Sequence, residues 1–151
     1  LLFSRNKGTG FDRGIDMLAV GTGASGSTAS PDIADFRQRK INNPLFRKGF
    51  TSVVYRTQDG LISNVPTNIV DFTTTFESSD AVGALTEMGL MSTKDGVGNN
   101  TADFDQLTDT FPDRNLTTDI TTKDILVNYL TFPVINKPSG AILAITWRLT
   151  F

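Results

Sequence analysis

The C-terminal segment, residues 143–151, alternates strictly between apolar and mostly polar side chains, and this pattern constrains the fold more than any other feature. The apolar members are Leu143, Ile145, Trp147, Leu149 and Phe151, and the residues between them are Ala144, Thr146, Arg148 and Thr150. Successive side chains of a strand point to opposite faces, so the segment is predicted to be a half-buried antiparallel strand. We expect Trp147 to anchor it in the core, and because the alternation reaches the last residue, we expect the whole strand to be packed.

Similar short runs occur along the rest of the chain. They predict strands at residues 15–20, 50–56, 61–65, 68–77, 83–91 and 125–132. Within 83–91, Ala84, Thr86, Met88 and Leu90 are expected to share one face. Asp59-Gly60 predicts a tight type I′ turn between two of the strands, since both central residues of such a turn need a positive φ. Pro133 has no N–H to donate, so it indicates an edge strand or the end of a strand.

Evidence for helices is thin. Ser30-Pro31-Asp32 resembles a helix start and predicts at most one short helix, through residues 36–39. Residues 92–123 are rich in Asp, Asn, Thr and Gly, which predicts a long polar loop. The fold class expected is therefore all-β: an antiparallel β-sandwich or barrel-like domain. Residues 15–151 are expected to form this single domain, and residues 1–14 an N-terminal extension or arm.

The composition excludes several kinds of catalytic and binding chemistry. Among 151 residues there is no cysteine and no histidine, which removes thiolate chemistry, the commonest general base and the commonest metal ligand. A net charge of −2 gives no electrostatic footprint for nucleic acid, and no apolar run is long enough to span a bilayer. The basic residues are scattered, and the densest group is Arg37, Arg39, Lys40, Arg47 and Lys48, which we expect to form a solvated face.

The stretch MLAVGTGASGST, residues 17–28, fits two nucleotide-binding patterns superficially. It reads G-x-G-x-x-G after an apolar run, and also as a phosphate loop in which Ser27 replaces the lysine. Pro31 blocks the continuous helix that should follow, and no acid occurs in the expected region, residues 41–46. We therefore expect a glycine-rich connector between strands and no nucleotide cofactor.

Two acidic features of the sequence are candidate sites. The segment from Asp103 to Asp113 offers oxygen ligands but lacks the spacing of a calcium loop, so a solvated loop is expected and no metal is assigned. Asp71 and Glu87 are the first carboxylates to test as a glycosidase-like pair. Strand carboxylates more often face solvent, and this is the expectation for both. No catalytic residue is assigned, and the chain is not expected to be an enzyme.

Several phrases, taken in order, carry a family resemblance. They are Ala19-Val-Gly-Thr-Gly23, Ser30-Pro31-Asp32, Ala84-Leu-Thr-Glu-Met-Gly-Leu90, Leu130-Thr-Phe-Pro133 with Lys137, and Ile145-Thr-Trp-Arg-Leu-Thr-Phe151. This order resembles small virion structural proteins of tailed bacteriophages, of the tail-collar fibre and head-decoration type. Met91 stands where that family usually has phenylalanine, and residues 93–122 interrupt its compact spacing. The family lends no catalytic residue.

The resemblance implies a non-enzymatic virion component, made in the cytoplasm of a host bacterium, in the tail, collar or fibre-attachment apparatus. A capsid decoration protein is the alternative within the same class. The expected partners are tail, neck or major capsid proteins and further copies of the chain, with a trimer as the working hypothesis, because virion parts are built by symmetry. A carbohydrate-binding module is the rival from another class, and it would need Phe104, Phe111 or Tyr129 exposed on a sheet face.

Overall fold

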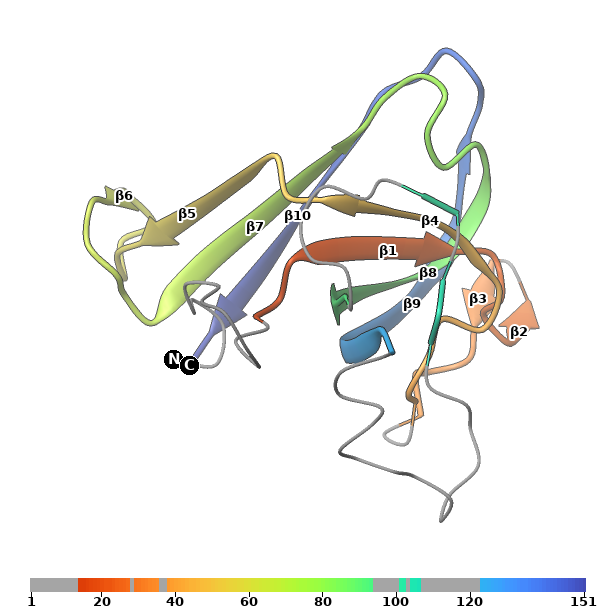
Figure 1. Ribbon diagram of the computed structural model, residues 1–151, viewed down its shortest axis with the longest axis horizontal. Coiled ribbons are helices and arrows are strands. Elements are labelled where there is room, and N and C mark those ends of the chain that lie inside the picture. The colour runs from red at the N-terminus through yellow and green to blue at the C-terminus, as the bar shows by residue number, and fades with distance from the viewer. Residues whose placement is uncertain (1–13, 28, 36–37, 94–100, 103, 107–122) are drawn as a thin grey trace.

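The computed structural model describes residues 14–27, 29–35, 38–93, 101–102, 104–106 and 123–151, and in these ranges every regular element is a strand (Figure 1). The strands are β1 (Met17–Gly21), β2 (Gly26–Ser27), β3 (Ser30–Pro31), β4 (Pro44–Gly49), β5 (Ser52–Arg56), β6 (Ile62–Ser63), β7 (Ile69–Phe76), β8 (Gly83–Ser92), β9 (Ile125–Lys137) and β10 (Leu143–Thr150). The all-β prediction is confirmed. Its proposed arm, residues 1–14, lies outside the described residues except for Gly14.

Two four-stranded antiparallel sheets make up most of the structure. The first has the order β4-β1-β8-β9 and the second β10-β7-β5-β6, while β2 and β3 form a small separate hairpin. Each large sheet keeps two edge strands, so of the two architectures expected, the described part of the chain adopts the sandwich and not a closed barrel.

Three connections carry the chain from one sheet to the other. β4 continues into β5, β7 into β8, and β9 into β10. β7 pairs with β10 and β8 with β9, so these four strands form a long two-stranded ribbon that folds over between the sheets (Figure 1). Where it folds, the Gly140 N–H donates to the Ser78 carbonyl at 3.1 Å, and the buried Lys137 ammonium donates to the Glu77 carbonyl at 2.8 Å.

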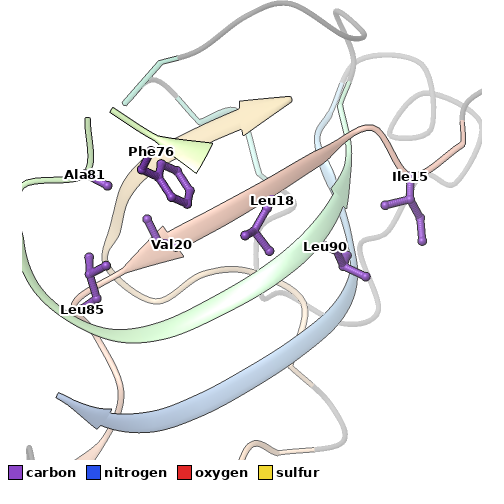
Figure 2. Packing of buried hydrophobic residues seen from close by; sticks show 7 residues of the cluster. All are labelled: Ile15, Leu18, Val20, Phe76, Ala81, Leu85 and Leu90. Atoms are coloured by element: carbon purple, nitrogen blue, oxygen red, sulfur yellow. The ribbon is translucent and has the colours of Figure 1, made fainter. Parts of the chain in front are cut away.

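The main core lies between the sheets. Leu18 and Val20 of β1, Leu85 and Leu90 of β8 and Phe76 of β7 are buried together there (Figure 2). Full burial of one such side chain stabilises the fold by about 1.5–3 kcal/mol. The apolar face of β10 packs against this cluster through Leu143, Ile145, Trp147 and Leu149, each partly buried. Trp147 therefore contacts the core as expected, whereas Phe151 is 57% exposed and falls after the strand.

The opposite face of the first sheet is covered as well. The residues buried there are Ala19 of β1, Met91 of β8 and Ile41 of the loop before β4, and we call them the outer cluster. Leu126 and Tyr129 of β9 pack against them. Because β1 and β8 are covered on both faces, they bury consecutive residues and do not show a simple alternation.

The shared face predicted for Ala84, Thr86, Met88 and Leu90 is wrong. The β8–β9 register shifts between Leu85 and Glu87, where residues 132–134 of β9 lie opposite the single residue Thr86. Such an irregularity changes the face to which the strand's side chains point, so Leu85, Met88 and Leu90 contact the same core while Ala84 is exposed. β9 runs through Pro133 at the edge of its sheet because the missing N–H falls in this irregular stretch.

Two local predictions also need correction. Ser30–Pro31 is strand β3 and not a helix start, and no helix occurs at residues 32–35 or 38–40 on either side of the undescribed pair 36–37. The turn at Asp59-Gly60 has a positive φ (81°) at Gly60 alone, so it is not type I′. Thr57 and Leu61 close a three-residue loop instead, with the Gly60 N–H bonded to the Thr57 carbonyl. Among the described residues there is also no helix that could cross a membrane.

Candidate functional site

Glu87 is fully buried, although it was expected to face solvent. It lies in β8, on the side of the first sheet that faces away from the main core, and its exposed fraction is 0%. Oε1 accepts hydrogen bonds from the Gly23 and Asn43 N–H groups, both at 2.8 Å. Oε2 accepts from the Asn42 N–H at 2.9 Å and from the Tyr129 hydroxyl at 2.7 Å. An ionised carboxylate has about four acceptor sites, and these donors fill them.

The glycines of the GTG stretch are explained by this carboxylate. A Cβ added to Gly21 would lie 2.5 Å from Ile41 Cγ2 and 2.6 Å from Glu87 Oε1. A Cβ added to Gly23 would lie 2.5 Å from the Asn43 nitrogen and 2.7 Å from Glu87 Oε1. The chain around residues 41–43 therefore presses directly onto the glycine backbone, and only a residue without a side chain leaves room for the contact.

The same geometry shows that the glycine-rich stretch does not have the structure of a nucleotide-binding loop. The fingerprint needs a helix after its glycines, so that the first N–H groups of the helix can receive a phosphate. Here Gly26, with φ at 86°, opens the β2–β3 hairpin, and the Asp32 N–H folds back onto the Ser25 carbonyl at 2.7 Å. The expected glycine-rich connector is what forms, and the Gly23 N–H binds a carboxylate of the same chain.

Tyr129 closes the site from β9. Its hydroxyl donates a hydrogen bond to Glu87 Oε2 and accepts one from the Asn42 side-chain nitrogen at 3.2 Å. Burial, and then the adjacent Glu87 carboxylate, raise the pKa of the Tyr129 hydroxyl well above its usual range. Tyr129 therefore keeps its proton at physiological pH and donates a hydrogen bond to Glu87.

Asp71 is buried too, in β7 of the other sheet, with an exposed fraction of 3%. Its carboxylate accepts from Arg148 Nε at 2.7 Å and Nη2 at 2.9 Å, on the neighbouring strand β10, and from Arg56 Nε at 2.9 Å, on β5. The Arg148 hydrogen bonds, and those of Arg56, hold the pKa of Asp71 below its usual value of 3.8 against the opposing effect of burial.

Asp71 and Glu87 therefore do not form the glycosidase-like pair that was considered. They belong to different sheets, and each is occupied by its own set of donors. A general acid must hold a proton near neutral pH and a nucleophile must have a free oxygen. The lowered pKa of Asp71 opposes the first role, and the four donors on Glu87 oppose the second.

Other buried polar groups also join distant segments. Asp16, before β1, accepts from the N–H and hydroxyl of Thr93, after β8, at 3.0 and 2.9 Å. Arg47 of β4 pairs with Asp124 at 2.5 Å, with both side chains almost fully buried, and lies 5.6 Å from the Phe104 ring centre. The prediction of a solvated basic face is thus wrong for Arg47.

The remaining predicted sites are only partly described. In the acidic segment 103–113, Asp105 pairs with Lys123 at 2.6 Å, and its other acids lie outside the described residues. The described ranges contain no group of three or more acidic side chains placed to hold a metal. Phe104 and Tyr129 both pack against the outer cluster of the first sheet and do not form an exposed aromatic platform, while Phe111 is outside the described residues.

Among the described residues, three strongly exposed apolar side chains occur close together in the sequence at the β5–β6 hairpin. Leu61, Ile62 and Val65 are 67%, 66% and 64% exposed, and we call these three residues the apolar tip. They fall within one short stretch at the far end of the second sheet, where β6 projects away from the first sheet (Figure 1). Exposed apolar clusters of this kind mark contact surfaces more often than isolated apolar residues do.

Comparison with known proteins adds no assignment: the chain matches no protein-family model and no curated protein.

Proposed function

We propose that the chain is a non-enzymatic structural component of a tailed-bacteriophage virion, in the tail, collar or fibre-attachment apparatus, and that it assembles through protein–protein contacts. The observation that carries the assembly role is the apolar tip, Leu61, Ile62 and Val65, displayed on a hairpin at one extremity of a sheet. The virion assignment rests on the resemblance of the phrases between Ala19 and Phe151 to small phage virion proteins.

The buried polar groups support the same role. Glu87 accepts hydrogen bonds from three backbone N–H groups of two loops and from the Tyr129 hydroxyl of β9. Asp71 of β7 binds an arginine on each of the two neighbouring strands, β5 and β10. Fully satisfied buried networks make a scaffold rigid and specify one arrangement of its parts. A rigid scaffold presents its contact surfaces in a fixed geometry, which suits repeated assembly better than it suits turnover.

Locating the protein in intact particles tests the proposal. Cryo-electron microscopy of virions purified from bacteria that produce this chain during infection should show it at the tail, collar or fibre attachment, at the copy number of that structure. Occupancy over the whole capsid would assign it to the decoration class instead. Particles that lack the protein altogether would contradict the virion assignment.

Variants of the apolar tip test the contact surface. Leu61→Asp with Ile62→Asp should leave the fold intact, because both side chains are mainly exposed, and should reduce incorporation of the protein into particles. The matched control is Ile33→Asp, which changes another exposed apolar residue, 95% exposed, away from the tip. Equal incorporation of the tip variant and the control would show that the tip is not the contact surface.

A further inference from the structure

The free edge of β10 differs from the other three edges of the two large sheets. Native proteins blunt edge strands with prolines, bulges, coverage or short length, because an open edge pairs with other chains. β4 begins at Pro44, and its Arg47 exchanges both backbone hydrogen bonds with Thr101. β9 contains Pro133, has an irregular register and lies beside β3, and β6 has two residues.

In the part of the chain that the structure describes, β10 has none of these protections. Its eight residues contain no proline or glycine, and they pair with β7 without a register shift. Among the described elements, only β7 lies alongside β10. With respect to the described residues, the edge is therefore long, regular and open.

The groups that β10 offers can be assigned. The Phe151 N–H donates to the Asn68 carbonyl at 2.9 Å and continues the β10–β7 register, so the odd-numbered residues bond to β7. In an antiparallel ladder the intervening residues point their N–H and C=O the other way. The free edge is thus formed by the backbone groups of Ala144, Thr146, Arg148 and Thr150.

We propose that this edge binds the same edge of a second copy of the chain, as an antiparallel strand pair with Thr146 on the two-fold axis. In this register Ile145 lies opposite Trp147 of the second copy, and Leu143 opposite Leu149. These side chains are only partly buried in one copy, whereas Phe72 and Phe76 of the neighbouring β7 are buried. Pairing covers the open side of the core with matching apolar side chains.

The charges of the edge also fit a second copy. Arg148 is the only charged residue of β10, and Asp71 of its own chain binds it. In the proposed register Arg148 lies opposite Ala144, so no like charges face each other across the two-fold axis. Such a contact is isologous and closes as a dimer, in place of the trimer expected from virion symmetry. It does not depend on the phage assignment.

Charge reversal at Thr146 tests the pairing, because this residue would lie opposite itself. Sedimentation velocity of the full chain should show a concentration-dependent dimer. Thr146→Lys and Thr146→Glu, each alone, should raise the dimer dissociation constant at least about ten-fold, since like charges then face each other. Mixing the two variants should restore the dimer. Ser52→Lys, an exposed residue on the inner strand β5, adds the same charge to the same sheet and should leave the dimer unchanged.

A second variant and a spectroscopic readout complete the test. Thr146→Pro removes an N–H that faces the free edge and none that bonds to β7, so it should abolish the dimer while the far-ultraviolet circular dichroism is retained. Trp147 is the only tryptophan, and its emission should shift to shorter wavelength as the wild-type chain dimerises. A wild-type monomer at all concentrations, or Thr146 variants that associate like the wild type, or no recovery on mixing, would each overturn the proposal.

Discussion

At the scale of single residues, Glu87 is the buried polar side chain with the largest predicted effect. Glu87→Gln keeps the shape of the side chain but replaces one acceptor oxygen with a donor NH₂ group, which then faces N–H and O–H donors. Because these donors are buried and lose an acceptor, the free energy of unfolding should fall by about 3 kcal/mol. Urea denaturation followed by Trp147 fluorescence measures this loss.

Tyr129→Phe is the matched control for that measurement. It removes a single donor from the same carboxylate and should cost about 1 kcal/mol, the usual net value of one hydrogen bond. A Glu87→Gln variant no less stable than Tyr129→Phe would show that the carboxylate does not hold residues 23 and 42–43 together.

The glycines of the GTG stretch give a second prediction. Gly23→Ala places a methyl group 2.5 Å from the Asn43 nitrogen, so the loop must move, and the free energy of unfolding should fall by about 1–3 kcal/mol. Ser25→Ala, in the same loop but exposed, should change it by less than about 0.5 kcal/mol. Equal thermal midpoints for the two variants would mean that the close approach of residues 41–43 is not needed for stability.

The Glu87 site could be predicted only in part from the sequence. Pro31 and the missing acid at residues 41–46 argue against a nucleotide loop by local rules, and Glu87 stands out as a carboxylate in a predicted strand. Its donors come from Gly23, Asn42, Asn43 and Tyr129, which lie 64, 45, 44 and 42 residues away in the chain. Nothing local to Asn42-Asn43 indicates that their N–H groups face a carboxylate, because that depends on how loops cross the sheet.

At the scale of strands, Asp71 links β5, β7 and β10 and makes the second sheet acid-sensitive. Its pKa is lowered in the folded state, so its contribution is complete above the unfolded value of about 3.8 and is lost as the pH falls through the lower folded pKa. Stability measured by urea denaturation should therefore decline below about pH 4. Asp71→Asn should flatten that decline and, at pH 7, cost about 1–2 kcal/mol, a modest value because solvent screens Arg148.

Asp71→Asn should not remove all of the acid sensitivity, because Asp80 contributes to it as well. Lys48 lowers its pKa in the same direction, so part of the acid sensitivity should persist in Asp71→Asn. The double variant with Asp80→Asn should lose more of it than either single variant. Identical pH profiles for the wild type and Asp71→Asn would mean that the arginines do not stabilise the carboxylate.

The face to which each strand residue points was predictable where one face of the strand is covered and unpredictable where both are. β10 shows the expected alternation, and so does β7 apart from the buried Asp71, because each strand has one side on the core and one side outside it. β8 does not, because loops cover its second face and its register shifts opposite Pro133. A sequence pattern records which residues are apolar, but a shift of register depends on the partner strand.

At the scale of the whole molecule, the two sheets share the main core, and the first sheet buries a smaller cluster on its other face as well. Phe76 of the second sheet is buried among Leu18, Val20 and Leu90 of the first, and three connections pass between the sheets (Figure 2). Alternation predicts that sheets exist and are antiparallel, but not which strands leave one sheet for the other. That assignment depends on pairings between residues far apart in the chain, such as β1 with β8 and β7 with β10.

A shared core predicts that the two sheets unfold together, which also tests the expectation of a single domain at residues 15–151. Trp147 reports on the second sheet, while circular dichroism reports on all strands, so the two urea curves of the wild type should coincide. Phe76→Ala should shift both curves equally, by about 3–5 kcal/mol, because it opens a cavity between the sheets. The opposite result would be a shifted fluorescence transition together with a circular dichroism transition that splits in two. The first sheet would then be stable without the second, and the ribbon of β7 to β10 would connect two separately folding units.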